Sequence, residues 1–276
     1  MHIPTPGPGQ VLIQTKASTI CGSDIRCIYK AHTGKGAEGY IPGMIAGHEP
    51  CGIIVEEGSN LKRFKKGDRV IVYHISGCGV CYDCRRGYYI SCKSEHRKAY
   101  GWQRDGGMAP YILAALMIAK ALGANQLIGV EMNPYRIELA KRLGLVDHVF
   151  EPENAVEEIM KVTKGKGVEK ALDASANANA RRIAIQATRE WGKIVFVGEG
   201  GTCTFAPSEE LLHGQKTIYG SWVTSLWKME DLVERLVKWG IHPEDLITHE
   251  FPLEKAAEAY ALMTQGDCGK VAVVFE

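Results

Sequence analysis

The chain has 276 residues, of which 45% are hydrophobic and 24% are charged, and its formal net charge is +1. This length and composition are typical of a soluble globular protein with room for two domains. The nearly balanced charge favours neither a nucleic-acid nor a membrane partner, and no apolar run reaches the roughly 18 residues of a transmembrane helix. The N-terminal stretch MHIPTPGPGQVLIQTK lacks the apolar centre of a secretion signal. We therefore expect a cytoplasmic protein.

Two stretches among the first sixty residues carry metal-ligand chemistry. The sequence STICGSDIRC contains Cys21 and Ser23, and IAGHEPCGIIVEEG contains His48 and Glu49. A thiolate, an imidazole and a carboxylate are the ligand types of a catalytic zinc, which keeps one position open. Two other interpretations stay open on local evidence, because a histidine beside a glutamate is often a structural pair and a lone cysteine is often a small buried hydrophobe.

The strongest local signal is the stretch CGVCYDCRRGYYISC. Its cysteines follow one another at spacings of three, three and eight residues: Cys78, Cys81, Cys84 and Cys92. Two-residue gaps let successive thiolates turn toward one ion, and the longer gap lets the chain close a tetrahedron. Four sulfur ligands with no open position predict a structural zinc site. The alternative, a redox pair of cysteines, leaves the other two unexplained.

The stretch from residue 108 to residue 131 joins two unlike patterns. MAPYILA (108–114) predicts a strand of the first domain, whereas ALMIAKALGA (115–124) predicts the end of a helix, with no turn signal between Ala114 and Ala115. The strand QLIGVE then ends in the acid Glu131. A dinucleotide-binding unit carries a glycine-rich turn about 20 residues before such an acid. The preceding DGGMAPYIL is no such turn.

Apolar strands and amphipathic helices alternate in the second half of the chain. We expect strands at 126–131, 147–150, 168–174, 193–198, 217–222 and 245–251, and helices at 134–143, 155–162, 178–189, 208–213 and 229–239. This alternation is typical of a doubly wound parallel sheet, which binds ligands beyond the carboxyl ends of its strands. Glu131 at such an end can accept both hydroxyls of an adenosine ribose and would repel a 2′-phosphate, which predicts NAD over NADP. The alternative is an acid that stabilises the start of the next helix.

Together these pieces make the chain resemble the zinc-dependent medium-chain alcohol and polyol dehydrogenases. The matching stretches are CGSD, GHEPCGIIVEEG, FKKGDRVIV, the four-cysteine stretch, WGKIVFVGEGG and GKVAVVF. The resemblance implies an α/β protein in three parts. These are a zinc-binding, GroES-like and mostly β catalytic domain (1–114), a doubly wound Rossmann-like cofactor domain (115–250), and a C-terminal return to the catalytic domain (251–276).

The resemblance also implies roles for residues near the first metal-ligand stretches. Cys21 and His48 would hold the catalytic zinc, and Glu49 would be a ligand in some states. Ser23 would stand next to the substrate hydroxyl and pass its proton toward solvent. Arg26 occupies the position where many members continue this relay with a histidine, and an arginine cannot lose a proton near neutral pH.

The NAD contacts come from the same resemblance. Arg136 would reach the ribose that Glu131 binds, Lys270 would lie near the pyrophosphate, and Val197 and Gly198 would lie along the nicotinamide ribose. Only glycine lets a backbone approach a ligand that closely. Without the resemblance, Arg136 and Lys270 would be interpreted as ordinary surface residues. The family further implies a homodimer or homotetramer, in which the strand at 217–222 pairs across a two-fold axis.

Members of the family carry a long segment between the 108–114 strand and the helix end that follows it. That segment holds the first Rossmann strand and the glycine turn, so the cofactor domain here is expected to be incomplete. One hypothesis is that the sequence joins two parts of a longer enzyme. The other is a true deletion that leaves a zinc-stabilised remnant, a binding or structural module without catalysis. The first is favoured because a sheet without its innermost strand leaves backbone groups unpaired.

The expected function is that of a zinc-dependent oxidoreductase. It would transfer a hydride from a small secondary alcohol or polyol to NAD, with zinc activating the hydroxyl and the nicotinamide accepting the hydride. The stretch after residue 207 resembles polyol and threonine-type enzymes, which favours a sugar alcohol or another small secondary alcohol. Tyr219 and Trp222 are expected to pack in the core rather than face a substrate.

Overall fold

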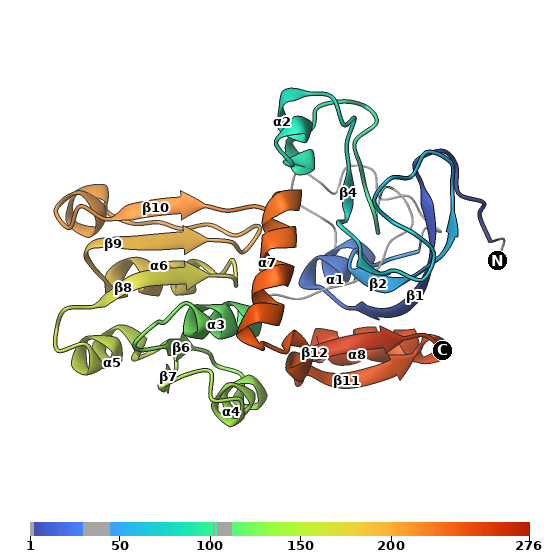
Figure 1. The fold of residues 1–276 in the computed structure, drawn as a ribbon. Coiled ribbons are helices and arrows are strands. Elements are labelled where there is room, and N and C mark those ends of the chain that lie inside the picture. The colour runs from blue at the N-terminus through green and yellow to red at the C-terminus, as the bar shows by residue number, and fades with distance from the viewer. Residues whose placement is uncertain (1–2, 30–44, 102, 104–111) are drawn as a thin grey trace. The chain divides into compact units, whose positions relative to one another are not determined.

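The computed structural model describes residues 3–29, 45–101, 103 and 112–276 (Figure 1). By its internal contacts the chain forms two compact units. Unit 1 comprises Met1–Pro110, Ser225–Asp231 and His242–Glu276, and unit 2 comprises Tyr111–Thr224 and Leu232–Ile241. The three domain ranges predicted from the sequence stay a prediction. No helix among the described residues is both long enough and apolar enough to cross a membrane.

Unit 1 is built on a mostly antiparallel sheet with the strand order β11-β12-β1-β2-β3. Only β11 and β12 run parallel to one another. The strands are β1 (Val11–Thr19), β2 (Pro50–Glu57), β3 (Arg69–Ile71), β11 (Ile247–Pro252) and β12 (Lys270–Val274). A small antiparallel pair, β4 (Ile75–Ser76) and β5 (Lys98–Ala99), lies apart from this sheet, and the helices are α1 (Gly22–Tyr29), α2 (Tyr82–Arg85) and α8 (Ala256–Gln265).

The pairing of β1 with β12 joins the two ends of the sequence in one core. Thr19 lies opposite Ala272, and the amide of Ile20 donates to the carbonyl of Val271 over 3.0 Å. Ile20 and Val271 are fully buried, and α8 packs on them through Ala259. Burial of each such aliphatic side chain contributes about 1.5–3 kcal/mol. The residue that begins β12, Lys270, is thereby brought beside the segment that follows β1.

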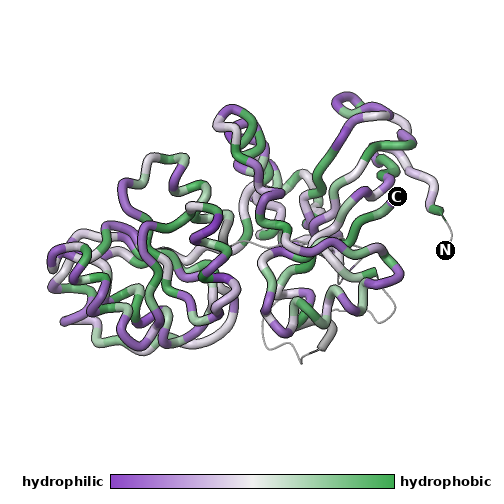
Figure 2. The backbone as a smooth tube through the Cα atoms, turned by 90° about the horizontal axis from the view of Figure 1, so that it is seen from below, coloured by the Kyte–Doolittle hydropathy of each residue, from purple (hydrophilic) through white to green (hydrophobic). Residues whose placement is uncertain are grey.

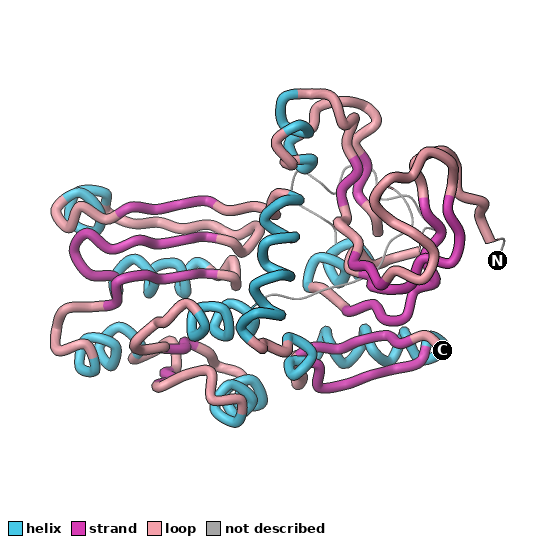
Figure 3. The backbone as a smooth tube through the Cα atoms, viewed as in Figure 1, coloured by secondary structure: helices cyan, strands magenta, loops and turns pink. Residues whose placement is uncertain are grey.

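Unit 2 alternates parallel strands with helices, as the sequence predicts (Figure 3). The strands are β6 (Ile128–Val130), β7 (His148–Phe150), β8 (Val168–Asp173), β9 (Thr188–Phe196) and β10 (Thr217–Gly220). The helices of this region are α3 (Ile112–Ala121), α4 (Pro134–Arg142), α5 (Ala155–Val162), α6 (Ala178–Ala187), the π-helix η2 (Ser208–Leu212) and α7 (Leu226–Trp239), whose residues are divided between the two units. Hydrophobic and hydrophilic residues alternate along these elements, as expected where one face is buried (Figure 2).

The parallel strands of unit 2 form two separate sheets. One has the order β10-β9-β8 and the other pairs β6 with β7. A core between α5 and α6, formed by Ala155, Ile159 and Ile183 with Ala187, lies within this unit. The sequence predicts that the cofactor domain lacks its inner strand. Among the described residues, the parallel strands of unit 2 form two sheets rather than one.

Two expectations from the sequence are wrong. The stretch 108–114 was expected to be a strand, but its described part, from residue 112 onward, belongs to α3. Ile, Leu, Ala and Met are compatible with a helix and nothing between them breaks one. Tyr219 and Trp222 were expected in the core, but they are 45% and 51% exposed. Tyr219 lies on β10, which among the described strands pairs only with β9, so this edge of the sheet is left open.

Candidate functional site

Cys21, His48 and Glu49 meet where β1 ends and β2 begins. Ser18 of β1 lies opposite Pro50 of β2, so the residue after β1 and the residues before β2 share one end of the sheet. One ligand atom from each of Cys21, His48 and Glu49 lies within 4.8 Å of the others. His48 is buried, and Cys21 and Glu49 are partly buried. The structure thus brings together the three residues that the sequence proposes as metal ligands.

Asp24 determines how the His48 ring is oriented. Its Oδ1 lies 3.1 Å from His48 Nδ1, and its Oδ2 accepts a hydrogen bond of 2.9 Å from the backbone amide of Cys21. With Nδ1–H directed at the carboxylate, Nε2 is the ring nitrogen left for a metal. His48 Nε2 lies 3.9 Å from Glu49 Oε1 and 3.4 Å from Ser23 Oγ. Ser23 Oγ also donates to Cys21 Sγ over 3.1 Å.

Asp24 lies in the stretch CGSD, but the sequence alone predicts no role for it. Its signal was its position three residues after Cys21 in the first turn of α1, which allows a bond back to the Cys21 amide. His74, which the sequence does not indicate as a site residue either, has its ring centroid 5.0 Å from that of His48. No pattern in the sequence around His74 predicts that its ring lies close to that of His48. The side chain of Arg26, proposed at the outer half of a proton relay, lies outside the described residues.

The charges of this cluster depend on burial and on close partners. Burial lowers the pKa of His48, but hydrogen bonds to Asp24 and Cys21 outweigh it and raise the pKa to about 10. Burial, with the nearby charge of His48, lowers the pKa of His74 to about 3. A metal ion at His48 Nε2 would therefore have to displace a proton from this ring.

Lys270 lies in the same unit, next to this cluster. Its side chain is 3% exposed, and its Nζ donates to the carbonyl of Ile20 over 2.8 Å. Burial lowers the pKa of Lys270 to about 7, with the neighbouring Glu49 and Cys21 acting in the opposite direction. The interpretation of Lys270 as an ordinary surface lysine is wrong. Its proposed approach to a pyrophosphate stays a prediction.

The four cysteines of the second site converge as their spacing predicts. One Sγ from each of Cys78, Cys81, Cys84 and Cys92 lies within 4.8 Å of the others, and no disulfide joins them. Backbone amides point at the sulfurs: Cys81 N donates to Cys78 Sγ over 3.4 Å, and Cys84 N donates to Cys81 Sγ over 3.5 Å. The amide of Val80 and then that of Cys81 lower the pKa of Cys78 to about 6, which favours a thiolate at neutral pH. A Cβ on Gly77 would lie 2.6 Å from Cys84 Sγ, so the lobe is closely packed.

Both donor sets fit zinc. Four convergent sulfurs leave no position for another ligand and suit a structural ion. The sulfur, nitrogen and oxygen donors of Cys21, His48 and Glu49 are three protein ligands, which is the number that a catalytic zinc takes while keeping an open position. Asp24 and Ser23, the polar residues around the Cys21, His48 and Glu49 cluster, supply the outer hydrogen bonds that catalytic zinc sites use.

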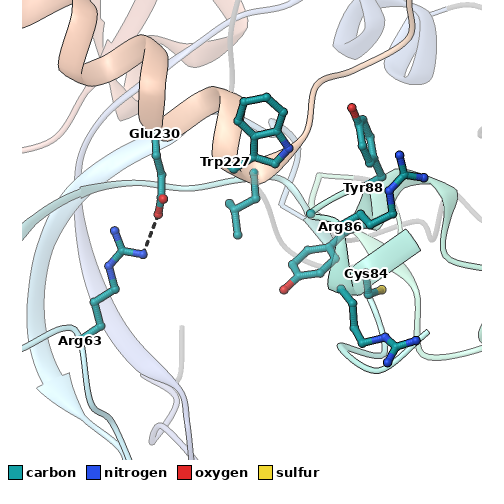
Figure 4. A pocket seen from close by; sticks show the side chains of 10 residues that line it. Arg63, Cys84, Arg86, Tyr88, Trp227 and Glu230 are labelled. Atoms are coloured by element: carbon teal, nitrogen blue, oxygen red, sulfur yellow. Dashed lines mark ion pairs between the residues drawn. The ribbon is translucent and has the colours of Figure 1, made fainter. Parts of the chain in front are cut away.

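A cavity of about 600 Å³ lies beside the four-cysteine lobe, within unit 1 (Figure 4). Cys84, Arg86 and Tyr88 of the lobe line it together with Trp227 of α7. Arg63 and Glu230 form an ion pair of 2.8 Å at its edge. The proposed catalytic residues do not line this cavity, so it is separate from the Cys21, His48 and Glu49 cluster.

Of the proposed cofactor residues, Glu131, Val197 and Gly198 lie directly after the carboxyl ends of strands in unit 2. Glu131 Oε1 accepts from the amides of Met132 and Asn133 over 2.9 and 3.0 Å, at the start of α4. This is the local role that the alternative interpretation of Glu131 proposed. Arg136 lies in the first turn of α4, where its amide donates to Asn133 Oδ1 over 3.2 Å.

Val197 and Gly198 follow β9 and are held against the end of β8. The amides of Val197 and Gly198 donate to the carbonyl of Asp173 over 2.8 and 3.2 Å. A Cβ on Gly198 would lie 2.3 Å from the backbone nitrogen of Ala176, so only glycine fits here. The roles of these residues toward a cofactor stay predictions.

One G-x-G-x-x-G match does occur in the sequence, GKGAEG at residues 34–39. It lies outside the described residues and far upstream of β6. A phosphate-binding match of this kind has meaning only between a strand and a helix of one βαβ unit. It therefore does not supply the turn that should precede Glu131.

Two family models match this chain. Residues 7–120 match the alcohol dehydrogenase GroES-like domain, and residues 113–239 match the zinc-binding dehydrogenase model. These matches confirm the predicted pairing of a GroES-like domain with a Rossmann-like domain. The two matches overlap at residues 113–120, a stretch that contains Ala114 and Ala115, where the sequence changes its pattern.

The chain is similar over nearly its whole length to proteins that are named as dehydrogenases. It is 43% identical over 331 positions to the "uncharacterized zinc-type alcohol dehydrogenase-like protein YphC" of Escherichia coli K12, covering 99% of this chain and 94% of that protein. It is 31% identical over 328 positions to an L-threonine 3-dehydrogenase of Pyrococcus horikoshii, covering 98% and 92%. Because the first alignment spans 331 positions and this chain has 276 residues, at least 55 positions have no residue here.

Solved structures share the fold. An alcohol dehydrogenase (rspB) of Escherichia coli CFT073, in complex with NADH, gives a TM-score of 0.83 at 23% identity and covers 100% of this chain and 94% of its own. A zinc-binding dehydrogenase of Sinorhizobium meliloti 1021, bound to NADP, gives 0.82 at 21% identity and covers 100% and 94%. At such identities the likeness concerns the fold alone.

Proposed function

This chain belongs to the zinc-type alcohol dehydrogenases, and we propose that it transfers a hydride from a small secondary alcohol or polyol to NAD, at a zinc ion held by Cys21, His48 and Glu49. The observation that carries the proposal is the convergence of these three donors, within 4.8 Å of one another, on an imidazole oriented by a buried aspartate. A second zinc, held by the four-cysteine lobe, would have a structural role.

The residues of the cluster have distinct roles in this proposal. A zinc ion bound there would act as a Lewis acid that lowers the pKa of a substrate hydroxyl. Asp24 holds the proton on His48 Nδ1 and so keeps Nε2 available as a donor. Ser23 Oγ, between Cys21 Sγ and His48 Nε2, is placed to accept the proton that leaves the substrate. Lys270, buried beside Glu49, offsets part of the negative charge of the site.

The preference for NAD rests on Glu131. A carboxylate at the end of the second Rossmann strand accepts the ribose hydroxyls and repels a 2′-phosphate. The similar solved structures were obtained with NADH in one case and with NADP in another, so the likeness of fold favours neither cofactor. The relative named L-threonine 3-dehydrogenase acts on a secondary alcohol, which agrees with the substrate class proposed for this chain.

Metal analysis joined to an activity assay tests the proposal. The purified protein should contain two zinc ions per chain and reduce NAD in the presence of a panel of secondary alcohols and polyols. Cys21→Ser and His48→Gln should each lose one zinc and the activity, while Cys203→Ser, altered outside both clusters, should keep both. Two bound zinc ions without NAD reduction on any member of the panel would contradict the proposed reaction.

The remnant hypothesis is the second candidate, favoured by the missing alignment positions. A chain that lacks the phosphate-binding turn should have no saturable affinity for NAD, and measurable saturation would exclude this candidate. The intact mass of the natural protein separates the two hypotheses directly. A mass of 30.3 kDa, that of the present sequence, would support a true deletion.

A further inference from the structure

The cavity beside the four-cysteine lobe has the size of a site for a small molecule. Its volume is about 600 Å³, within the range of roughly 300–1,000 Å³ that ligand sites in proteins have. All of its lining residues belong to unit 1, and most come from the lobe and from the start of α7. Cys21, His48 and Glu49 are not among them, so the proposed reaction gives this cavity no function.

Direct contacts hold the lobe and the start of α7 together at the cavity wall. The amide of Leu226 donates to the carbonyl of Gly87 over 2.9 Å. Gly87 has a φ of 80°, and a Cβ at this position would lie 3.2 Å from Cδ1 of Trp227. The indole of Trp227 thus lies against the lobe. Because these contacts exist without a ligand, the wall is already formed, which lowers the ordering cost of binding.

Positive charge is in excess among the residues that line the cavity. The single glutamate of the lining, Glu230, is already paired with Arg63 over 2.8 Å. Two further arginines, Arg85 and Arg86, line the cavity, and neither has an acidic partner within the part of the chain that the structure describes. A guanidinium without an acid beside it attracts an anion, and its planar fork matches a carboxylate.

Tyrosine rings hold the guanidinium of Arg86 in position. Its Nη1 donates to the hydroxyl of Tyr82 over 3.1 Å. Its Cζ lies 4.9 Å from the centroid of the Tyr82 ring and 5.7 Å from that of the Tyr88 ring. A cation that is held in this way has less side-chain freedom to lose when it binds an anion.

Three aromatic side chains complete the lining: Tyr88, Tyr89 and Trp227. In Figure 4, Trp227 lies between Tyr88 on one side and Glu230 on the other. A small inorganic anion would leave these rings and most of the volume without contacts, whereas a flat ring can pack against them. The lining therefore fits a molecule that carries both a negative charge and an aromatic ring.

We propose that this cavity binds a small aromatic carboxylate, whose carboxylate is held by Arg86 and whose ring packs against Trp227 and the neighbouring tyrosines. The site lies on the lobe and the start of α7, and its lining residues differ from those of the Cys21, His48 and Glu49 cluster.

Isothermal titration calorimetry of the zinc-loaded protein with three probes tests the site. Benzoate carries the ring and the charge, benzamide carries the ring without the charge, and acetate carries the charge without the ring. Benzoate should bind saturably and about tenfold more tightly than either of the others, because it alone combines charge-assisted hydrogen bonds with ring packing. Benzamide or acetate binding as tightly as benzoate, or benzoate without saturation, would overturn the proposal.

Two arginines provide a matched pair of variants. Arg86→Gln should weaken the binding of benzoate by about tenfold and leave that of benzamide nearly unchanged. Arg142→Gln changes an exposed arginine in the last turn of α4, in unit 2, and should leave both affinities unchanged. Equal affinities of the two variants for benzoate would overturn the proposal, because a carboxylate bound at the zinc cluster would not respond to Arg86.

Two tryptophans test the ring contact, and they keep the proposal testable if Arg86→Gln does not fold. Trp227→Leu keeps an apolar side chain but removes the ring, and it should weaken the binding of benzoate by about two- to tenfold. Trp222→Leu is the control, because Trp222 is 51% exposed in unit 2 and Trp227 is 52% exposed. Equal effects of these two variants would overturn the proposal.

The carboxylate site does not depend on the proposed dehydrogenase reaction. A protein that binds benzoate through Arg86 but does not reduce NAD would overturn only the proposed function. A protein that reduces NAD but does not bind benzoate would overturn only the carboxylate site.

Discussion

Arg181 and Asp173 form a buried ion pair that holds together the ends of two strands. Arg181 Nε donates to Asp173 Oδ2 over 3.1 Å, and both side chains are almost inaccessible to solvent. The same guanidinium donates through Nη2 to the carbonyl of Gly198 over 2.7 Å. Asp173 also accepts from the amide and hydroxyl of Ser175 over 3.0 and 2.6 Å. The loop after β8 and the loop after β9, which begins with the proposed cofactor residues Val197 and Gly198, are thus joined through Arg181 of α6.

Replacing Arg181 should therefore destabilise the protein strongly. Arg181→Met leaves the Asp173 carboxylate buried without its cation, and such a loss costs about 3–5 kcal/mol. Arg182→Met is the matched control, because Arg182 makes a 2.8 Å pair with Glu210 but is 35% exposed, and pairs of this kind contribute about 0–1 kcal/mol. Denaturant unfolding of the two variants measures the difference. Equal losses of unfolding free energy in the two variants would show that burial does not increase the contribution of the Arg181–Asp173 pair to stability.

Removing the carboxylate that orients His48 should weaken metal binding. Asp24→Asn keeps the size of the side chain but removes the charge that fixes the imidazole proton on Nδ1. Loss of such an outer partner lowers metal affinity by about 10–100-fold. Competition of the protein with a fluorescent zinc chelator gives the affinity. Asp68→Asn, which changes an acid that accepts from the Lys65 amide and belongs to neither metal-ligand cluster, should leave the zinc affinity unchanged. An Asp24→Asn protein with the original affinity would contradict the role given to Asp24.

Loss of one thiol from the four-cysteine lobe should release one zinc ion. Cys84 is buried and is one of the four sulfur ligands of the lobe, so Cys84→Ser removes one ligand of the zinc site. A structural site of four sulfurs depends on each of them. We expect one zinc fewer by metal analysis and faster proteolysis between residues 78 and 92. Cys51→Ser, whose sulfur bonds to the Ala17 carbonyl instead, should retain the full zinc content. A redox pair would predict the reverse, namely unchanged metal content with a lost disulfide.

The lowered pKa of Glu210 should make the free energy of unfolding decrease as the pH falls into the acidic range. The amide of Ala206 and the nearby Arg182 hold the pKa of Glu210 below its ordinary value of 4.5. A carboxylate with a lowered pKa in the folded state stabilises the protein above pH 4.5 and loses this contribution as the pH falls through the lowered value. Unfolding measured between pH 7 and pH 3 should show less acid sensitivity for Glu210→Gln than for the original chain. The exposed neighbour Glu209 provides the control. If Glu209→Gln reduced the dependence of the unfolding free energy on pH by the same amount, the role given to Glu210 would be refuted.

Much of this molecule follows from local sequence. The helix at 155–162 begins and ends as predicted, because amphipathic periodicity is a property of consecutive residues. The four cysteines converge because short gaps leave their sulfurs few alternatives. The sequence also shows no glycine-rich turn directly before Glu131, and the described parallel strands of unit 2 form two sheets rather than one.

Pairings between distant residues could not be obtained in this way. Lys270 reaches the carbonyl of Ile20 only because β12 pairs with β1, which joins residues 250 positions apart. Tyr219 is exposed because β10 is an edge strand, a fact of strand order that its own apolar sequence does not carry. The family and the metal-binding lobe can thus be predicted from short stretches of sequence, because their structure depends on residues that are close together along the chain. The orientation of His48 by Asp24, the burial of Lys270 and the division of the unit 2 strands into two sheets arise only when the strands assemble, because each depends on which segments become neighbours in space.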